Sequence, residues 1–290
     1  MSMFWRDGQL VREDETRFSP TLFSLNYAVC GFEGIRSYQT GSVKHVFRLH
    51  DHVSRFISTC EYLGIESKYL DSNFLIDSIV NIVSSSESGD LYIRPIAYFD
   101  EGIMNLKDTP PAVVSIFAQQ FQPKSSGELS IEISGRVRDV STIARKISRN
   151  YFDSYMALRS KSQDYDEVLM LSSNGLVTET SAHNIFFELS SGEIVTPSLD
   201  YCLPGITRDC VITLLSTLKI PVSERAISIE ELSQVTSAAI CSTASEMKIV
   251  KKIGEWELRT HKTLFETVKL LLQDSIHGDG YLSKEWNKYV

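Results

Sequence analysis

The sequence predicts an α+β fold of two domains, and three observations support this prediction. Residues 1–120 mix short alternating segments with amphipathic ones, which are typical of strands and helices. Gln119–Glu128 (QQFQPKSSGE) is polar and contains Pro and Gly, as linkers do. Beyond this segment, short strand patterns dominate the chain. We therefore expect a small N-terminal domain at 1–120, a linker at 121–128 and a larger domain at 129–290.

The first part of the chain contains strand and helix patterns in turn. Val43–Leu49 alternates like a strand, and Asp51 begins an amphipathic helix. Leu70–Val83 has the apolar spacing of a second helix. Leu91–Tyr98 and Ala112–Phe117 are rich in β-branched and aromatic residues and are predicted to be strands.

The second part is predicted to consist mostly of short strands. These strands are Asp166–Leu171, Gly175–Thr180, Asn184–Leu189 and Ile194–Thr196. Ser173-Asn174-Gly175 and Ser190-Ser191-Gly192 separate them with residues typical of hairpin turns. One helix follows Gly205, and another is expected at about Thr260–Gln273. No internal repeat or glycine-rich nucleotide-binding fingerprint is present.

Composition indicates a soluble globular protein that does not bind nucleic acid or membranes. Of its 290 residues, 42% are hydrophobic and 23% are charged, and the net charge is −8. Nucleic acids and anionic membranes call for a basic face, which this balance does not favour. The five cysteines form no C-x-x-C pair, so neither a disulfide framework nor a metal site is predicted. The residues from Met1 lack the pattern of a signal peptide, and we expect a cytoplasmic protein.

Leu203–Asp209 (LPGITRD) has the features of an anion-binding turn. Pro204-Gly205 favours a tight turn, and the apolar spacing that starts at Ile206 predicts a helix. A turn that leads into a helix leaves the first backbone N–H groups unpaired, and the helix dipole favours an anion there. The Thr207 hydroxyl can add a hydrogen bond. Taken alone, the segment is equally compatible with an ordinary Pro-Gly turn that Thr caps.

Several charged residues interrupt apolar segments and are candidates for a site. Glu179 lies in a predicted strand, where a buried carboxylate needs a cationic or protonated partner and an edge carboxylate faces water. Arg94 interrupts an apolar strand and can offer a forked donor to a carboxylate. Arg36 and Arg55 are either binding residues or members of structural ion pairs. His50 and His52 lack further ligands at metal spacing, so we interpret them as structural.

A phosphate socket, a buried carboxylate and several arginines would together suit pyridoxal phosphate. This cofactor needs an anion site, an acidic partner for its pyridine nitrogen and a lysine. Lys146, in Ser141–Ile147, is a candidate lysine. Local patterns do not indicate whether these groups meet in space.

Read together, the motifs resemble those of the class IV pyridoxal-phosphate aminotransferases, most closely the branched-chain amino acid aminotransferases. The resemblance rests on Gly31–Arg36 (GFEGIR), Tyr92–Pro95 (YIRP) and Leu203–Asp209, which follow one another in the family's order. It extends from Trp5–Gly8 (WRDG) to Ser242–Ala244 (STA) and so covers most of the chain. It implies a two-domain fold-type-IV enzyme with a smaller N-terminal α/β domain and a larger C-terminal pseudo-barrel domain.

The resemblance also implies roles for individual residues. Lys146 is expected to be the Schiff-base lysine and the catalytic acid–base, Tyr151 to lie near the cofactor's phenolic oxygen, and Glu179 to pair with its pyridine nitrogen. The residues expected to bind the cofactor phosphate are Arg55, Ile206, Thr207 and Thr243. The residues expected on the substrate side are Tyr27, Phe32, Arg36, Tyr92, Arg94, Thr243 and Ala244.

The implied activity is ping-pong transfer of an amino group between a branched-chain L-amino acid and 2-oxoglutarate, as in branched-chain amino acid biosynthesis. A homodimer or higher homo-oligomer is expected by the same analogy. The chain departs from the family at Ile147-Ser148-Arg149, where a small or glycine-rich stretch is usual. It departs again after Glu179, where the family often has a Gly and a second Glu before Asn and this chain has Thr180-Ser181-Ala182-His183-Asn184.

These departures keep other activities open. A D-amino acid aminotransferase, an (R)-amine transaminase and aminodeoxychorismate lyase belong to the same class. A non-catalytic protein with this fold is the alternative from another class.

Overall fold

The computed structural model describes residues 3–12, 18–87, 89–100, 105–107, 109–122, 127–278, 280 and 282–290. The chain forms two compact units. The first comprises Met1–Gln122, Lys146–Arg149 and Ile276–Val290, and the second comprises Pro123–Arg145 and Asn150–Ser275. This division differs from the expected limits at Lys146–Arg149 and at the C-terminal segment. Part of the expected linker, residues 123–126, lies outside the described residues.

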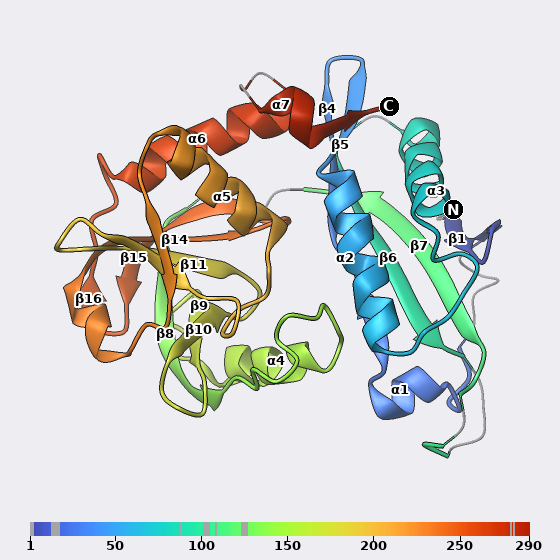
Figure 1. Ribbon diagram of the computed structural model, residues 1–290, viewed down its shortest axis with the longest axis horizontal. Helices are drawn as coiled ribbons and strands as arrows, with labels where there is room; N and C mark the ends of the chain where they lie inside the picture. Colours follow the sequence, from blue (N-terminus) through green and yellow to red (C-terminus); the bar gives the residue numbers. More distant parts are fainter. Residues whose placement is uncertain are drawn as a thin grey trace. The chain divides into compact units, whose positions relative to one another are not determined.

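The first unit is built on an antiparallel sheet in the strand order β17-β5-β4-β6-β7-β1-β2, with β3 paired to β6. Its strands are β1 (Met3–Arg6), β2 (Gln9–Arg12), β3 (Cys30–Phe32), β4 (Ile35–Thr40), β5 (Val43–Phe47), β6 (Leu91–Phe99), β7 (Ala112–Gln120) and β17 (Asn287–Tyr289). Its helices are α1 (Phe23–Tyr27), α2 (Leu49–Tyr62), α3 (Ser72–Ser85) and α7 (Ser283–Trp286). Helices α2 and α3 pack together over the sheet (Figure 1).

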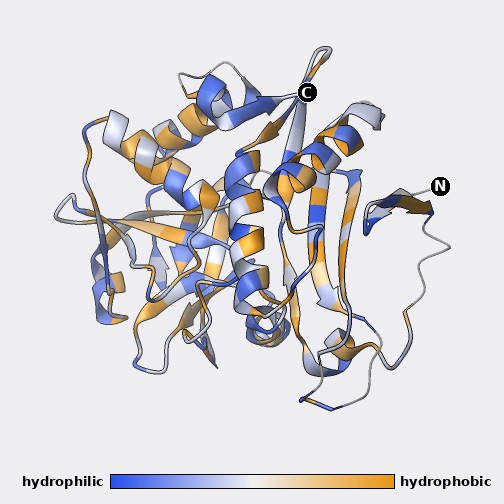
Figure 2. Ribbon diagram, turned by 45° about the vertical axis from the view of Figure 1, so that its right-hand side comes forward, coloured by the Kyte–Doolittle hydropathy of each residue, from blue (hydrophilic) through white to orange (hydrophobic). Residues whose placement is uncertain are grey.

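Alternating side chains make the core of the first unit. Ile35, Ile93 and Val114 of the sheet belong to one apolar cluster with Phe56 of α2 and Ile79 of α3, and all five are buried. Hydrophobic and hydrophilic residues accordingly alternate along the strands and around the helices (Figure 2). The period of two in strands and of 3.6 in helices therefore explains both the elements and their packing.

The second unit contains a curled mixed sheet in the order β10-β9-β8-β15-β14-β11-β12-β13, with β16 paired to β15 (Figure 1). Its strands are β8 (Leu129–Val137), β9 (Glu167–Leu171), β10 (Val177–Thr180), β11 (Asn184–Leu189), β12 (Ile194–Pro197), β13 (Val222–Arg225), β14 (Val235–Ser242), β15 (Glu246–Ile253) and β16 (Trp256–Glu257). Its helices are α4 (Asn150–Ser160), α5 (Ile206–Thr217), the short 3₁₀ helix η2 (Glu230–Gln234) and most of α6 (Leu264–His277). The predicted α+β fold of two domains is confirmed.

Turn and cap residues set the boundaries of these elements. Gly175 and Gly192 have φ of 73° and 87°, in the left-handed region that glycine adopts without strain, and they close the predicted hairpins. Helix α6 begins four residues later than the predicted start because Thr263 and Glu266 form a capping box. The Glu266 N–H donates to Thr263 Oγ1 (3.3 Å), and the Thr263 N–H donates to Glu266 Oε2 (3.2 Å).

No helix within the described ranges is long and apolar enough to cross a membrane.

Candidate active site

Lys146 lies beside the Gly31–Arg36 motif in the first unit. The backbone of Lys146–Ser148 runs antiparallel to β3: the Phe32 N–H donates to Lys146 O (3.1 Å), and the Ser148 N–H donates to Cys30 O (3.0 Å). Lys146 Nζ is 5.5 Å from the centroid of the Phe32 ring. Two segments that are far apart in sequence are thereby joined.

Arg94 and Tyr92 approach the other side of this motif. Arg94 Nη2 donates to Tyr92 Oη at 2.6 Å, and the guanidinium carbon of Arg94 is 4.7 Å from the Phe32 ring centroid. A Cβ at Gly34 would stand 2.3 Å from Tyr92 Oη, which no side chain could tolerate without movement of the tyrosine. The glycine in the motif is therefore explained by the close approach of Tyr92. Phe32, Tyr92, Arg94 and Lys146 form one cluster.

A buried carboxylate, Glu33, holds Arg55. Arg55 Nε donates to Glu33 Oε1 (2.6 Å) and Arg55 Nη2 to Glu33 Oε2 (2.9 Å), while His52 Nδ1 contacts Oε2 at 2.9 Å. Burial alone would raise the pKa of Glu33, but Arg55 and the hydrogen bond from His52 hold this pKa well below its usual range. Burial lowers the pKa of His52, so its neutral ring donates Nδ1–H to the carboxylate. His52 is thus structural, as predicted from sequence.

Arg36 and Tyr27, two further predicted substrate-side residues, also lie in the first unit. Arg36 is buried, its Nη2 is 3.1 Å from Asp90 Oδ2, and its guanidinium carbon lies 4.2 Å from the ring centroid of Tyr38 and 3.9 Å from that of Phe121. Tyr27 is half-buried at the end of α1 and packs on the core of the unit. Arg36 therefore already has an internal carboxylate partner.

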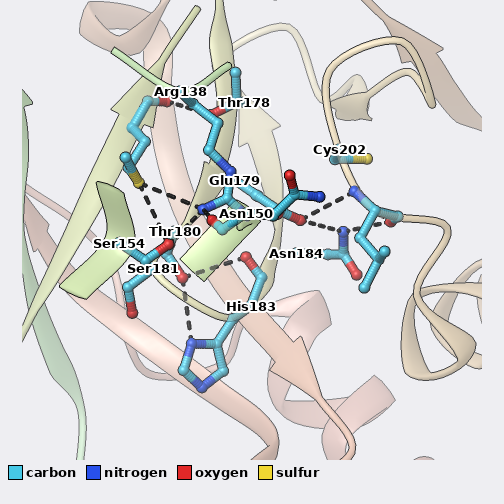
Figure 3. A network of polar contacts seen from close by, with 12 residues as sticks. Arg138, Asn150, Ser154, Thr178, Glu179, Thr180, Ser181, His183, Asn184 and Cys202 are labelled. Atoms are coloured by element: carbon cyan, nitrogen blue, oxygen red, sulfur yellow. Dashed lines mark hydrogen bonds and ion pairs between the residues drawn. The ribbon is translucent and has the colours of Figure 1, made fainter. Parts of the chain in front are cut away.

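Glu179 is the centre of a buried polar network in the second unit (Figure 3). Its Oε1 accepts from Arg138 Nη2 at 2.6 Å. Its Oε2 accepts from the Leu203 N–H at 3.1 Å and from Asn184 Nδ2 at 3.3 Å. Arg138 also donates to Asn150 O and to Ser154 Oγ. Glu179 is therefore a buried, paired residue and not an edge carboxylate in water.

The network leaves Glu179 able to bind one more donor. A carboxylate offers about four lone-pair positions, and the hydrogen bonds from Arg138, Leu203 and Asn184 do not use all of them. A ring N–H of a pyridinium is a donor of the required kind. The residues present therefore fit the pyridine nitrogen of a pyridoxal cofactor.

The segment Leu203–Asp209 forms a turn that leads into α5, as the sequence predicts. Gly205 is the N-cap residue in extended conformation, and no side chain caps the helix. A Cβ at Gly205 would stand 2.0 Å from Asn184 Oδ1, so this glycine permits the contact with a residue of the Glu179 network. The N–H groups of Ile206 and Thr207 belong to the first turn, where a helix favours an anion.

A second turn in this unit contains Thr243 and Ala244. It connects β14 to β15, where Ser242 pairs with Glu246. Ala244 is exposed and Thr243 is half-buried. This turn therefore presents both residues at the surface of the unit.

Tyr151 lies near the start of α4 and is half-buried. It follows Asn150, whose side-chain amide donates to the carbonyls of Thr142 and Arg145 at 2.8 Å each. Asn150 thus orders the chain immediately before Lys146.

The structure gives the positions of Ile147, Ser148 and Arg149, where the chain departs from the family. Ile147 is buried, the Ser148 hydroxyl donates to Ala28 O at 2.8 Å, and Arg149 is exposed. Burial raises the pKa of Cys30 and of Cys202 to about 12, so both remain thiols. No group of three potential metal ligands occurs among the described residues.

Sequence reasoning overlooked Arg138, Asn184 and Glu33 as site residues. Glu33 lies inside a recognised motif, and that position was a usable signal. Arg138 comes directly after β8 and is two residues beyond Arg136. Arginines at every second position are common on exposed strands, so this spacing does not indicate burial. The partner of Arg138, Glu179, is 41 residues away.

Comparison with protein families gives a match over most of the chain. The model described as "Amino-transferase class IV" matches residues 31–253. A probable branched-chain-amino-acid aminotransferase of Aquifex aeolicus is 32% identical over 279 residues, which cover 89% of this chain and 88% of that protein. The branched-chain-amino-acid aminotransferase of Pseudomonas aeruginosa is 25% identical over 300 residues, which cover 99% and 97%.

Solved structures give the same relation. The branched-chain aminotransferase of the archaeon Thermoproteus uzoniensis with norvaline has a TM-score of 0.93 and 30% identity, covering 99% of each chain. A T.th. branched-chain amino acid aminotransferase complexed with N-(5'-phosphopyridoxyl)-L-glutamate has a TM-score of 0.91 and 26% identity, covering 99% of this chain and 98% of that one. The same enzyme has also been solved with pyridoxamine 5'-phosphate.

Proposed function

The chain belongs to the class IV aminotransferase family, and we propose that it is a branched-chain amino acid aminotransferase that uses pyridoxal 5'-phosphate. The amino donor is a branched-chain L-amino acid, the acceptor is 2-oxoglutarate, and the reaction is ping-pong. The names of the relatives support the substrate class, and the complexes of the T.th. enzyme support the cofactor.

The observation that best supports this proposal is the buried carboxylate of Glu179. Donors from Arg138, Asn184 and Leu203 fix it, and an acceptor position stays available. When bound, the cofactor supplies a carbonyl that receives the amino group and a protonated ring that accepts electrons from the substrate. Glu179 accepts the ring N–H and keeps the proton on that nitrogen.

Lys146 is the proposed acid–base. Its amine would hold the cofactor at rest and, once free, would move the substrate Cα proton to the cofactor. Tyr151 donates a hydrogen bond to the cofactor's phenolic oxygen. The cofactor phosphate is bound by Arg55, Ile206, Thr207 and Thr243, of which the middle two are at the start of α5.

The substrate carboxylate is proposed to bind Tyr92, Arg94 and the Thr243-Ala244 turn. The 2.6 Å hydrogen bond between Arg94 and Tyr92 supports their action as one unit. Tyr27 and Phe32 are proposed to line the pocket for the substrate's side chain. Arg36 assists through the Arg36–Asp90 pair, which holds β4 against the strand that carries Tyr92.

The test of the cofactor proposal is spectroscopic. Purified protein is expected to show visible absorbance that borohydride removes, and peptide mass analysis is expected to find the reduced cofactor on Lys146. Lys146→Ala abolishes both, whereas Lys284→Ala, which removes an exposed lysine, changes neither. Wild-type protein without a reducible chromophore would refute the proposal.

The substrate is tested with a panel of amino donors and 2-oxoglutarate. Leucine, isoleucine and valine are expected to give the highest kcat/KM, with parallel double-reciprocal lines for a ping-pong reaction. Glu179→Ala is expected to retain some cofactor and lose most turnover, and near-normal kcat would contradict its assignment. Turnover of D-amino acids or (R)-amines, or release of pyruvate without a keto acid, would redirect the assignment to one of the other class IV activities.

We further propose a cytoplasmic homodimer in branched-chain amino acid biosynthesis. Light scattering of the holoenzyme tests the assembly, and a monomer that is fully active would exclude it.

A further inference from the structure

Three side chains of the second unit form a hydrogen-bond relay, Glu167–His183–Ser245, that the proposed function does not use. Glu167 Oε2 is 3.2 Å from His183 Nδ1, and His183 Nε2 is 3.0 Å from Ser245 Oγ. Both His183 and Ser245 are absent from the motifs that carried the resemblance. The three residues come from β9, the β10–β11 connection and the β14–β15 turn.

Glu167 anchors this relay as an ionised carboxylate. Its Oε1 accepts from the Val168 N–H (2.8 Å) and the Ser181 N–H (3.4 Å), which leaves Oε2 for the histidine. Burial would raise the pKa of Glu167, but the hydrogen bond and charge of His183 and the donors around Oε1 hold this pKa below its usual value. The anchor is therefore an acceptor.

The charge of Glu167 determines the direction of its hydrogen bond with His183. An ionised carboxylate only accepts, so His183 Nδ1 carries a hydrogen toward it. Thr180 Oγ1 lies 3.2 Å from the same nitrogen and donates its own hydrogen to His183 O, so it also acts as an acceptor toward the ring. His183 Nε2 and Ser245 Oγ, which are 3.0 Å apart, form the second hydrogen bond of the relay.

Ser245 lies in the turn that connects β14 to β15. Its N–H donates to Ser242 Oγ at 3.3 Å, and the following Glu246 has a φ of 54°. The backbone N–H groups of Thr243 and Ala244 have no backbone acceptor in the described part of the chain. The backbone of the turn is thus constrained, and two hydrogen bonds to side chains hold it in place. The N–H groups of Thr243 and Ala244 are available as donors to a ligand.

We propose that Glu167, His183 and Ser245 are positioning residues that hold the Ser242–Glu246 turn in the shape in which Thr243 binds a phosphate ester. This inference rests on the proposed function, because it takes the phosphate to be that of the cofactor. Since Ser245 Oγ is hydrogen-bonded to His183, Ser245 acts on the turn and not on the ligand. Loss of the relay therefore loosens the phosphate contact without removing it.

The test compares cofactor forms with and without phosphate. The apoprotein of each variant is titrated with pyridoxal 5'-phosphate and with pyridoxal, and binding is followed by absorbance. Ser245→Ala removes the hydrogen bond to His183, and His183→Leu removes both relay hydrogen bonds. Each variant is expected to raise the Kd for the phosphate form about three- to tenfold. The Kd for pyridoxal is expected to stay within about twofold of wild type, because that ligand lacks the group the turn binds.

Two further variants separate positioning from general damage. His183→Gln places an amide at the position of Nε2 and is expected to recover much of the affinity that His183→Leu loses. His261→Leu removes a histidine of the same unit whose side chain is 85% exposed and is expected to change neither Kd.

Variants that bind pyridoxal 5'-phosphate like wild type, or that lose both ligands equally, would overturn the inference while the proposed function stands. Wild-type protein that bound no pyridoxal 5'-phosphate would overturn both.

Discussion

Replacement of Arg138 by methionine is expected to destabilise the second unit severely, because it leaves Glu179 as a buried charge without its cation. Arg138 is 4% exposed and donates to Glu179, to the Asn150 carbonyl and to the Ser154 hydroxyl. Methionine keeps an unbranched apolar chain in place of the arginine stem but lacks the guanidinium. The variant therefore removes the charge and the donors and leaves space where the guanidinium stood.

The magnitude follows from the geometry of the pair. Removing one partner of a buried ion pair costs about 3–5 kcal/mol, because the other charge stays desolvated. For a unit of this size, each kcal/mol lowers the melting temperature by roughly 2–4 °C, so a decrease of roughly 6–20 °C is expected. Leu203 N–H and Asn184 still donate to Glu179, which favours the lower half of this range.

The assay is thermal unfolding of the apoprotein, followed by circular dichroism, in a double-mutant cycle with Glu179→Gln. The neutral amide does not need a cation, so Arg138→Met is expected to cost at least about 2 kcal/mol less in the Glu179→Gln background. Arg136→Met, which removes a more exposed neighbouring arginine, is the matched control and is expected to change little. Strict additivity of the two substitutions would refute the reasoning.

Three further predictions concern stability. Gly205→Ala is expected to lower the melting temperature by several degrees, since its Cβ would collide with Asn184 Oδ1, and an unchanged melting curve would show that the turn can shift. Thr263→Ala is expected to cost about 1 kcal/mol in denaturant unfolding through loss of the α6 cap, and Thr263→Ser should recover most of it. The pKa values of His52 and Glu33 are both lowered in the folded state, so unfolding takes up protons below their ordinary values of 6.5 and 4.5. The free energy of unfolding should therefore decrease as pH falls through these values, and equal stability at about pH 7.5 and pH 4.5 would contradict the assignment.

The sequence predicted the elements whose signals are local. Strand patterns predict β5, β6, β7 and β9 to β12, whereas β1 to β4, β8 and β13 to β16 are not predicted individually. Gly175 and Gly192 mark hairpins because their φ values favour glycine. Apolar spacing predicts too early a start for α6 because it does not define a first residue, whereas the Thr263–Glu266 capping box does. A hydrogen bond can be predicted from the sequence when its two partners are three or four residues apart.

Features that depend on strand pairing could not be predicted in this way. Asn287–Tyr289 is short and polar, yet it forms β17 against β5 and brings the C-terminal segment into the first unit. Likewise Arg138 meets Glu179 only because β8 and β10 both pair with β9. Neither pairing has a local pattern that distinguishes it from an exposed segment.

The buried charges of the candidate site are better explained by function than by stability. Glu33 and Glu179 are each almost fully buried, and each is paired with an arginine of its own unit. A buried ion pair contributes little net stability relative to apolar side chains of similar volume, because desolvation offsets the attraction between the charges. Fixed charges are useful, however, where a ligand's charge must be met without rearrangement. Glu33 lies within the Gly31–Arg36 motif, and Glu179 is the residue proposed to meet the cofactor ring, which is where such preorganisation would be needed.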